Sequence, residues 1–237
     1  MLTKPQRISL YGVVLAFFCL YPANSIAAPA KKPAPARIRK TSPAARSSTP
    51  VHRSSMSGNI NILFGQKLLD DNDWEPVENQ FEFGIEADIK ELSWPVSITM
   101  SYAHSSDDDT VYYYDYDPYW RSSGDIEGKT SELNIGVKKI WDQPSGIHPF
   151  LAGGLSIIDA EREREFWETR NHVVVRWKSS DSDSGLGIWF GGGIYWTLNQ
   201  IFNLGVELKY SHAEVTLFNE DCEAGGLHYG ILLGYHF

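Results

Sequence analysis

Cysteine is scarce in this sequence: Cys19 and Cys222 are the only two among 237 residues. Cys19 lies in an apolar segment near the N-terminus that we expect to be removed, which leaves Cys222 alone. A lone cysteine cannot form a disulfide within its own chain, so we expect Cys222 to be an inert thiol in a loop.

Long apolar runs are also missing. The longest one, Leu10–Tyr21, is shorter than the roughly 20 residues that a membrane-spanning helix needs. Basic residues precede this run and small residues follow it, with Ser25 and Ala27 at the −3 and −1 positions of a cleavage site. The pattern predicts that residues 1–27 are a secretory signal peptide cleaved near Ala27. An uncleaved anchor helix is the alternative.

Acidic residues are absent from residues 1–57, which hold nine of the 21 Lys and Arg residues. Residues 58–237 carry 12 basic and 30 acidic residues, so a basic arm precedes an acidic body. Residues 28–57 are rich in Pro, Ala and Ser and show no periodicity, which predicts a disordered basic periplasmic tether. A solvated spacer is the simpler interpretation, and contact with a polyanion such as peptidoglycan is the alternative. Nucleic acid is not expected as a partner of an exported chain.

In the body, residues 58–237, apolar and polar residues alternate. Side chains of a β-strand alternate between two faces, so the pattern predicts strands with one apolar face. Gln80–Lys90 is the clearest example, because Phe81, Phe83 and Ile85 alternate with polar or small residues. Eight stretches are predicted as strands: Asn59–Lys67, Gln80–Lys90, Trp94–Ala103, Thr130–Trp141, Pro149–Ile158, Gly185–Trp196, Ile201–Ser211 and Gly225–Phe237.

The connections between these strands alternate strictly between long and short. The long ones are Leu68–Asn79, His104–Lys129, Asp159–Ser184 and His212–Ala224. Short periplasmic turns and longer outer loops are typical of transmembrane barrels with strands of about ten residues. The predicted fold is all-β: an eight-stranded antiparallel up-and-down transmembrane β-barrel over residues 58–237, with short periplasmic turns and long outer loops.

The two strand faces differ as a membrane barrel requires. The apolar face carries aromatic residues near strand ends, as interfacial girdles do. The other face carries glycines, which leave room for Trp189 and Tyr195, together with the charged residues Glu82, Glu86, Asp88, Glu132, Lys138, Glu207, Lys209 and His228. The interior of an eight-stranded barrel is just wide enough for side chains, so these charges must pair there.

The body resembles the small eight-stranded bacterial outer-membrane barrels, a family that includes the OmpA transmembrane domain, OmpX and opacity-type surface proteins. The resemblance rests on His148–Leu155, Leu204–His212 and the last strand, where Leu233, Tyr235 and Phe237 share one face. It implies an outer-membrane location among lipid and lipopolysaccharide. It also implies that the barrel assembly machinery recognises the last strand.

No cofactor or metal site and no catalytic group is predicted. Lipid A deacylases of this fold carry a His-x-Ser-Asn motif, but His212 is followed by Ala213 and Glu214. Ser211 adjoins His212 and must point to the opposite face of a regular strand. The sequence therefore favours a non-catalytic structural or surface-interaction role, like that of an adhesin. A lipid A-modifying enzyme is the alternative, and a narrow pore is the third possibility.

Two long connections carry candidate binding surfaces. One is rich in aromatic residues, which provide contact area at low entropic cost, and predicts a surface for an outer ligand: Tyr112, Tyr113, Tyr114, Tyr116, Tyr119 and Trp120. Asp107–Asp109 could hold Ca²⁺ or simply repel neighbours. In the other connection, alternation over Glu161–Lys178 predicts that the fifth and sixth strands extend as a hairpin. Its basic residues suit lipopolysaccharide phosphates, and surface ion pairs among Glu161–Arg164 are the simpler account.

The terminal aromatic residue gives a first prediction. Phe237→Ala should refold in detergent, because losing one lipid-facing ring costs at most about 3 kcal/mol. It should nevertheless assemble poorly in cells, since the resemblance implies that the assembly machinery reads this end. His236→Ala, which changes the inward-facing neighbour, is the matched control and should assemble normally. Equal assembly of both variants, measured as folded barrel in outer-membrane fractions, would contradict the prediction.

Overall fold

The computed structural model describes residues 56–237, except residues 92, 115–119 and 171–172 and the side chains of residues 113–122 and 169–172. The predicted signal peptide lies outside the described residues, as does most of the predicted tether. Met56 and Ser57 already belong to the first strand, so the barrel begins two residues earlier than predicted.

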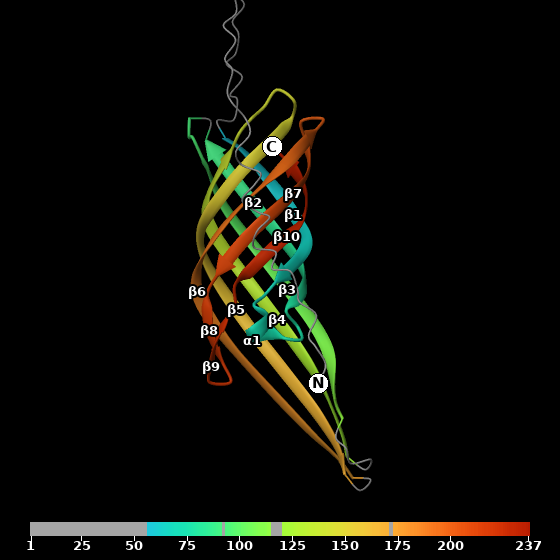
Figure 1. The fold of residues 1–237 in the computed structure, drawn as a ribbon. Helices are drawn as coiled ribbons and strands as arrows, with labels where there is room; N and C mark the ends of the chain where they lie inside the picture. Colours follow the sequence, from blue (N-terminus) through green and yellow to red (C-terminus); the bar gives the residue numbers. More distant parts are fainter. Residues whose placement is uncertain (1–55, 92, 115–119, 171–172) are drawn as a thin grey trace, which may run out of the picture. The chain divides into compact units, whose positions relative to one another are not determined.

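Eight strands form a closed antiparallel ring in the order β1-β10-β7-β6-β5-β4-β3-β2, which returns to β1 (Figure 1). The bounds are β1 Met56–Leu68, β2 Asn79–Glu91, β3 Ser97–Tyr114, β4 Trp120–Ile140, β5 Ile147–Arg170, β6 Val173–Leu198, β7 Phe202–His212 and β10 Gly226–His236. Consecutive ring strands are neighbours, which is the up-and-down arrangement. The predicted all-β, eight-stranded fold is confirmed.

The first and last strands close the ring. β1 pairs with β10 over ten residue pairs, from Asn59↔His236 to Leu68↔Leu227. Beyond this register, the Gly58 N–H donates to the Phe237 carbonyl at 2.9 Å, and the Phe237 N–H donates to the Gly58 carbonyl at 3.0 Å. Each ring strand therefore has a partner on both sides within the barrel wall, where its backbone polar groups pair with those of its neighbours.

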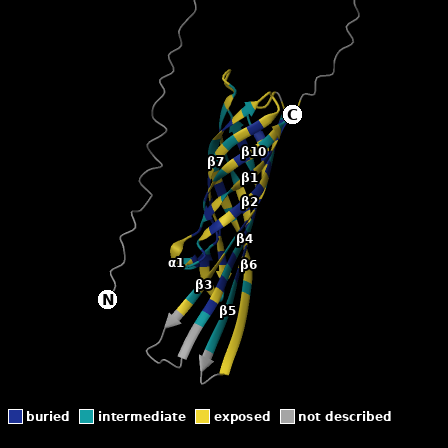
Figure 2. Ribbon diagram, turned by 90° about the vertical axis from the view of Figure 1, so that its right-hand side faces the viewer, coloured by how far each residue is buried: buried dark blue, intermediate teal, exposed yellow. Residues whose placement is uncertain are grey.

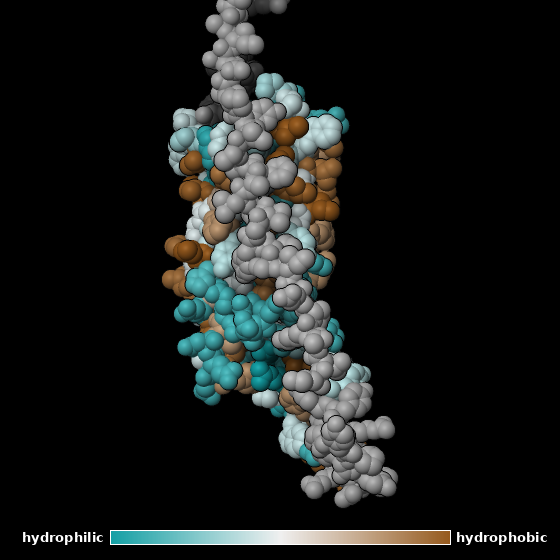
Figure 3. Space-filling model, viewed as in Figure 1, coloured by the Kyte–Doolittle hydropathy of each residue, from teal (hydrophilic) through white to brown (hydrophobic). Residues whose placement is uncertain are grey.

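The two faces of the wall differ in polarity as predicted. Phe81 and Leu155 point outward and are 60% and 61% exposed, whereas Glu82 and Asp88 point inward and are each 1% exposed. Buried and exposed residues alternate along the strands in Figure 2. Figure 3 shows apolar residues gathered on the outside of the barrel near the short turns. The barrel is therefore apolar outside and polar inside, the reverse of a soluble barrel.

Glycines make room for the bulky side chains of the lumen. Trp189 and Tyr195 are each 4% exposed, as their predicted inward direction requires. A Cβ added to Gly205 would lie 2.6 Å from the Cβ of Tyr195, and one added to Gly193 would lie 2.8 Å from the Phe150 ring. Both distances are too short for carbon atoms in contact, so the filled lumen depends on glycine at these two positions.

Strands β3 to β6 continue well beyond their neighbours. β2 pairs with β3 as far as Ser106, and β7 pairs with β6 as far as Ile188. The extended parts form a four-stranded sheet, called here the projecting sheet: Asp107–Tyr114, Trp120–Lys129, Asp159–Arg170 and Val173–Ser184. The predicted hairpin of the fifth and sixth strands is confirmed. The prediction of a loop over His104–Lys129 is wrong, because most of this connection extends β3 and β4.

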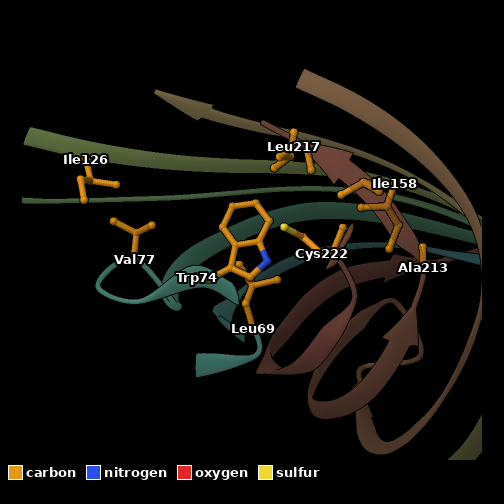
Figure 4. Close-up of a cluster of buried hydrophobic side chains, with 11 residues drawn as sticks. Leu69, Trp74, Val77, Ile126, Ile158, Ala213, Leu217 and Cys222 are labelled. Atoms are coloured by element: carbon orange, nitrogen blue, oxygen red, sulfur yellow. The ribbon is translucent and has the colours of Figure 1, made fainter. Parts of the chain in front are cut away.

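Two short elements lie at the same end of the barrel. Helix α1, Asp71–Trp74, follows β1, and a hairpin of β8, Glu214–Leu217, and β9, Glu220–Glu223, follows β7. Their apolar residues and those of neighbouring strands form the mouth cluster (Figure 4): Leu69, Trp74, Val77, Ile126, Ile158, Ala160, Ala213, Val215, Leu217, Cys222 and Ala224. Trp74 is fully buried, and its Nε1 donates to the Glu223 carbonyl at 2.8 Å. No described helix is long and apolar enough to cross a membrane.

Candidate functional site

Buried charges fill the lumen near the mouth cluster. This mouth-side network consists of Lys67, Glu82, Glu132, Lys209, Ser211 and His228. Glu132 lies at its centre, with Lys209 Nζ at 3.1 Å from one carboxylate oxygen and Lys67 Nζ at 3.5 Å from the other. Lys67 also donates to the Ala224 carbonyl at 2.9 Å, which links the network to the mouth cluster. The predicted inward direction of these charges is confirmed, and they pair with one another.

A second set of polar residues occupies the lumen near the short turns. Lys138 forms ion pairs with Glu86 and with Asp88, the latter at 3.7 Å. Asn59 donates to Asp88 at 3.0 Å, and Asn61 donates to Glu86 at 3.1 Å. Between the two sets of polar residues, a cavity of only about 10 Å³ remains beside Glu86. That is close to the smallest space that holds one water molecule, so the lumen is filled.

The mouth-side network contains a serine–histidine–carboxylate chain that was not predicted from the sequence. Ser211 Oγ lies 2.9 Å from His228 Nε2, and His228 Nδ1 lies 2.5 Å from Glu82 Oε2. This connectivity resembles that of a hydrolase triad. However, Ser211 Oγ also lies 2.9 Å from Glu132 Oε2, and Ser211 is fully buried. The chain is therefore enclosed within the ion-pair network of the lumen.

His212 lies apart from this chain. Its side chain is 48% exposed on the outer face, where Nδ1 contacts a carboxylate oxygen of Glu223. Ser211 points into the lumen, so the two neighbours face opposite sides, as predicted from strand geometry. The alternation of the last strand predicts the inward direction of His228, but nothing in its local sequence indicates Ser211 as its partner.

The predicted aromatic surface lies largely outside what the structure describes. The side chains of Tyr113, Tyr114 and Trp120, and all of Tyr116 and Tyr119, are outside the described residues. Tyr112 is described and lies exposed on β3. Burial and the neighbouring carboxylates raise the pKa of Asp107. In the described part of the chain, no three His, Cys, Asp or Glu side chains are placed to share a metal ion.

The outer edge of β6 is uncovered near its tip. Residues Val173–Ser180 are exposed at every position, on both faces of the strand. Closer to the barrel, the β8–β9 hairpin covers this edge. The N–H groups of Thr216 and Phe218 donate hydrogen bonds to the carboxylates of Asp183 and Asp181. A polypeptide edge with apolar residues such as Val174 and free backbone groups can pair with another strand.

The charges of the β5–β6 hairpin are arranged differently from the prediction. No ion pair forms among the described residues within Glu161–Arg164, because consecutive strand residues point to opposite faces: the two glutamates share one face and the two arginines share the other. The ion pairs run across the hairpin instead, from Arg176 to Glu165 and from Lys178 to Glu163. Arg162 is buried and donates to the carbonyls of Asp73 and Glu75, at 2.7 and 3.2 Å.

Cys222 is a free thiol buried in the mouth cluster, on β9 and not in a loop as predicted. Burial raises the pKa of the Cys222 thiol, which lowers the fraction of reactive thiolate. Its role in this position is apolar packing.

The network around Glu132 gives a second prediction. Glu132→Ala would leave Lys67 and Lys209 buried without their shared carboxylate, so the free energy of unfolding should fall by about 3–5 kcal/mol. Glu127→Ala is the matched control, because the Glu127–Lys129 pair, at 2.7 Å, is more than one-third exposed. It should cost less than about 1 kcal/mol. Urea titration in detergent micelles measures both, and equal losses would contradict the assigned role of Glu132.

No protein-family model and no curated protein matches the sequence. Several solved structures have a similar fold. The attachment invasion locus protein Ail of Yersinia pestis is 12% identical with a TM-score of 0.45, over 76% of this chain and 98% of Ail. The outer membrane protein OprG from Pseudomonas aeruginosa is 11% identical with a TM-score of 0.47, over 77% of this chain and 96% of OprG.

The architecture of this chain follows from its own geometry. The ring is closed by β1 and β10, its outer face is apolar, and its lumen is filled by paired charges. Long hairpins project at one end and short turns lie at the other. The described chain is therefore an eight-stranded antiparallel up-and-down β-barrel, built like the small outer-membrane barrels that its sequence resembles.

Proposed function

We propose that this protein is an integral outer-membrane barrel. The observation that carries this proposal is the apolar outer face, on which Phe190, Leu186 and Val206 are 62%, 75% and 58% exposed. A continuous apolar surface of this kind is unstable in water and suits a lipid environment. Lipid and lipopolysaccharide would surround the ring, and the assembly machinery would recognise β10 with Leu233, Tyr235 and Phe237 on its outer face.

The unequal ends of the barrel support one orientation. Short turns such as Trp141–Gly146 lie at the end where Phe237 pairs with Gly58, and the projecting sheet lies at the other. Outer-membrane barrels place short turns in the periplasm and long connections outside. In this orientation the projecting sheet and the mouth cluster would face the exterior, and the basic tether, residues 28–55, would lie in the periplasm after cleavage near Ala27.

The projecting sheet supports a surface-interaction role, like that of an adhesin. Its β6 edge is uncovered over Val173–Ser180 and carries Val174, Val175 and Trp177. An extended segment of another protein could add to this edge as a further strand, with main-chain hydrogen bonds giving affinity and side chains giving selectivity. The sheet continues the strand pairing of the barrel wall without a break, so the edge is already in the extended conformation that a further strand needs.

A non-catalytic role accords with the chemistry of the interior. The Ser211–His228–Glu82 chain is enclosed in the lumen, and Ser211 also contacts Glu132. Lipid A would have to pass the wall to reach it. A change in the mass of lipid A between cells with and without this protein would contradict the proposal and favour the enzyme. The filled lumen, with a cavity of about 10 Å³, likewise accords with the absence of a steady pore.

Orientation and membrane location can be tested with two matched cysteines. In a Cys222→Ala background, Ser179→Cys lies on the exposed part of β6 and Ser145→Cys lies in the exposed turn between β4 and β5. A bulky polyethylene glycol maleimide should label Ser179→Cys on whole cells. It should label Ser145→Cys only after the outer membrane is opened. The reverse pattern would overturn the orientation, and recovery in the soluble periplasmic fraction would overturn the membrane location.

The interaction role makes a separate prediction for the edge. A lysine on an edge strand hinders pairing with another strand, because it places a charge where that strand would lie. The double change Val174→Lys and Val175→Lys should therefore abolish most of the protein capture seen with the parent barrel in pull-down experiments. Ser182→Lys with Ser184→Lys, on the same strand but in the part that the β8–β9 hairpin covers, is the control for added charge. Equal capture by the valine double variant and the parent would contradict binding through this edge.

A further inference from the structure

A pocket of about 330 Å³ lies at the mouth, between α1, the projecting parts of β4 and β5, and β9. It lies outside the lumen. Ile126 and Phe166 contribute apolar wall, and most of the other lining residues are charged, with both signs present. A volume of this size is at the lower end of the range for small-molecule sites.

Arg162 lines this pocket with an unsatisfied group. The residue is 7% exposed, and its two terminal nitrogens donate to the carbonyls of Asp73 and Glu75. Its Nε is buried and has no acceptor among the described residues. Carbonyl dipoles satisfy donors but do not neutralise a charge, and an unpaired buried charge is costly. Burial first, and then the charge of Arg164, lowers the pKa of Arg162.

Arg164 places a second guanidinium group at the same pocket. It lies two residues from Arg162 on β5, so the two side chains share a face. Its Cζ lies 4.5 Å from the centre of the Phe218 ring, which holds the group by a cation–π contact. The ion pairs described in the projecting sheet belong to Lys129, Arg176 and Lys178, and neither pocket arginine has one there. Two adjacent guanidinium groups that form no ion pair within 4.0 Å among the described residues suit an oxyanion.

Carboxylates line the same pocket: Asp73, Glu75, Glu220 and Asp221. The pocket therefore carries four negative and two positive groups. A bare oxyanion would be repelled by the carboxylates, and a bare cation would be repelled by the arginines. A ligand that carries a positive and a negative group a few atoms apart can pair with the carboxylates and with the arginines at the same time.

We propose that this pocket binds a small zwitterion whose oxyanion pairs with Arg162 and Arg164. The ammonium group of the ligand would face Glu220, which shares its face of β9 with the pocket residue Cys222, and Phe166 and Ile126 would cover the carbon atoms of the ligand. Such a ligand could be a free metabolite of the phosphoethanolamine type or the same group on a lipid. This site is distinct from the β6 edge, and its binding does not depend on the surface-interaction role.

The test uses the whole barrel refolded in an uncharged detergent and titrated calorimetrically with phosphoethanolamine. Phosphoethanolamine should bind at least about tenfold more tightly than inorganic phosphate or ethanolamine, each of which carries one of the two charged groups. Phosphate binding equally well would overturn the zwitterion, and an absence of binding up to millimolar concentrations would overturn the site. A second titration with phosphatidylethanolamine in mixed micelles distinguishes the lipid source: competition with the free compound indicates that the lipid headgroup also enters.

Arg164→Gln is the informative variant, because Arg164 makes no described hydrogen bond on which α1 depends. It should weaken phosphoethanolamine binding roughly tenfold or more, since it removes a charge-assisted hydrogen bond. Arg176→Gln is the matched control, because Arg176 also stacks on an aromatic ring, that of Trp167 at 5.8 Å, but does not line the pocket. Heat-modifiable gel mobility confirms folding of both. Unchanged binding by folded Arg164→Gln, or an equal loss with Arg176→Gln, would overturn the proposal.

Discussion

The pairing of β1 with β10 is the constraint on which the rest of the barrel depends. Once this pairing closes the ring, the backbone polar groups of the ring are satisfied, and the side chains alone decide what each face can contact. The outer face is apolar, so every charge of the ring strands that points inward has to find a partner in a narrow lumen. Glu132 forms ion pairs with both Lys67 and Lys209. The three strands that carry these residues must therefore be closely positioned for the buried charges to be neutralised.

Alternation in the sequence predicts the ring strands because their two faces contact media of different polarity. Gln80–Lys90 illustrates this, since almost every outward residue is apolar and every buried position is polar or small. Alternation of apolar and polar residues does not predict the parts of the strands that extend beyond the ring. Residues Asp107–Asp109 and Ser122–Gly124 are polar or small on both faces and are typical of loops in isolation. Pairing with β4 and β5 makes them strands, and that pairing is inherited from the ring below.

For the candidate sites, too, the sequence predicts some properties of the residues and not others. Inward direction could be predicted for Glu82 and His228, because direction depends on position along one strand. The contacts of His228 with Ser211 and with Glu82 could not be predicted, because they depend on which strands become neighbours and at what register. Arg162 is the sharper case. The Asp73 carbonyl that accepts a hydrogen bond from Arg162 lies 89 residues away, in α1. The sequence neighbours of Arg162 are glutamates and an arginine, a pattern that predicts surface ion pairs. Only the fold reveals a buried guanidinium group.

The unbroken pairing of β5 and β6, from Ile147↔Trp196 to Arg170↔Val173, has a consequence for how the exposed end can diverge during evolution. One residue inserted into a single strand would turn all later side chains to the opposite face, unless a bulge absorbed it. Added lengths that keep the faces in phase come as two residues in each strand, and they raise the tip in steps of about 7 Å. The height of the exposed end above the barrel is therefore expected to be quantised among related chains, while the composition of its uncovered edge is free to drift.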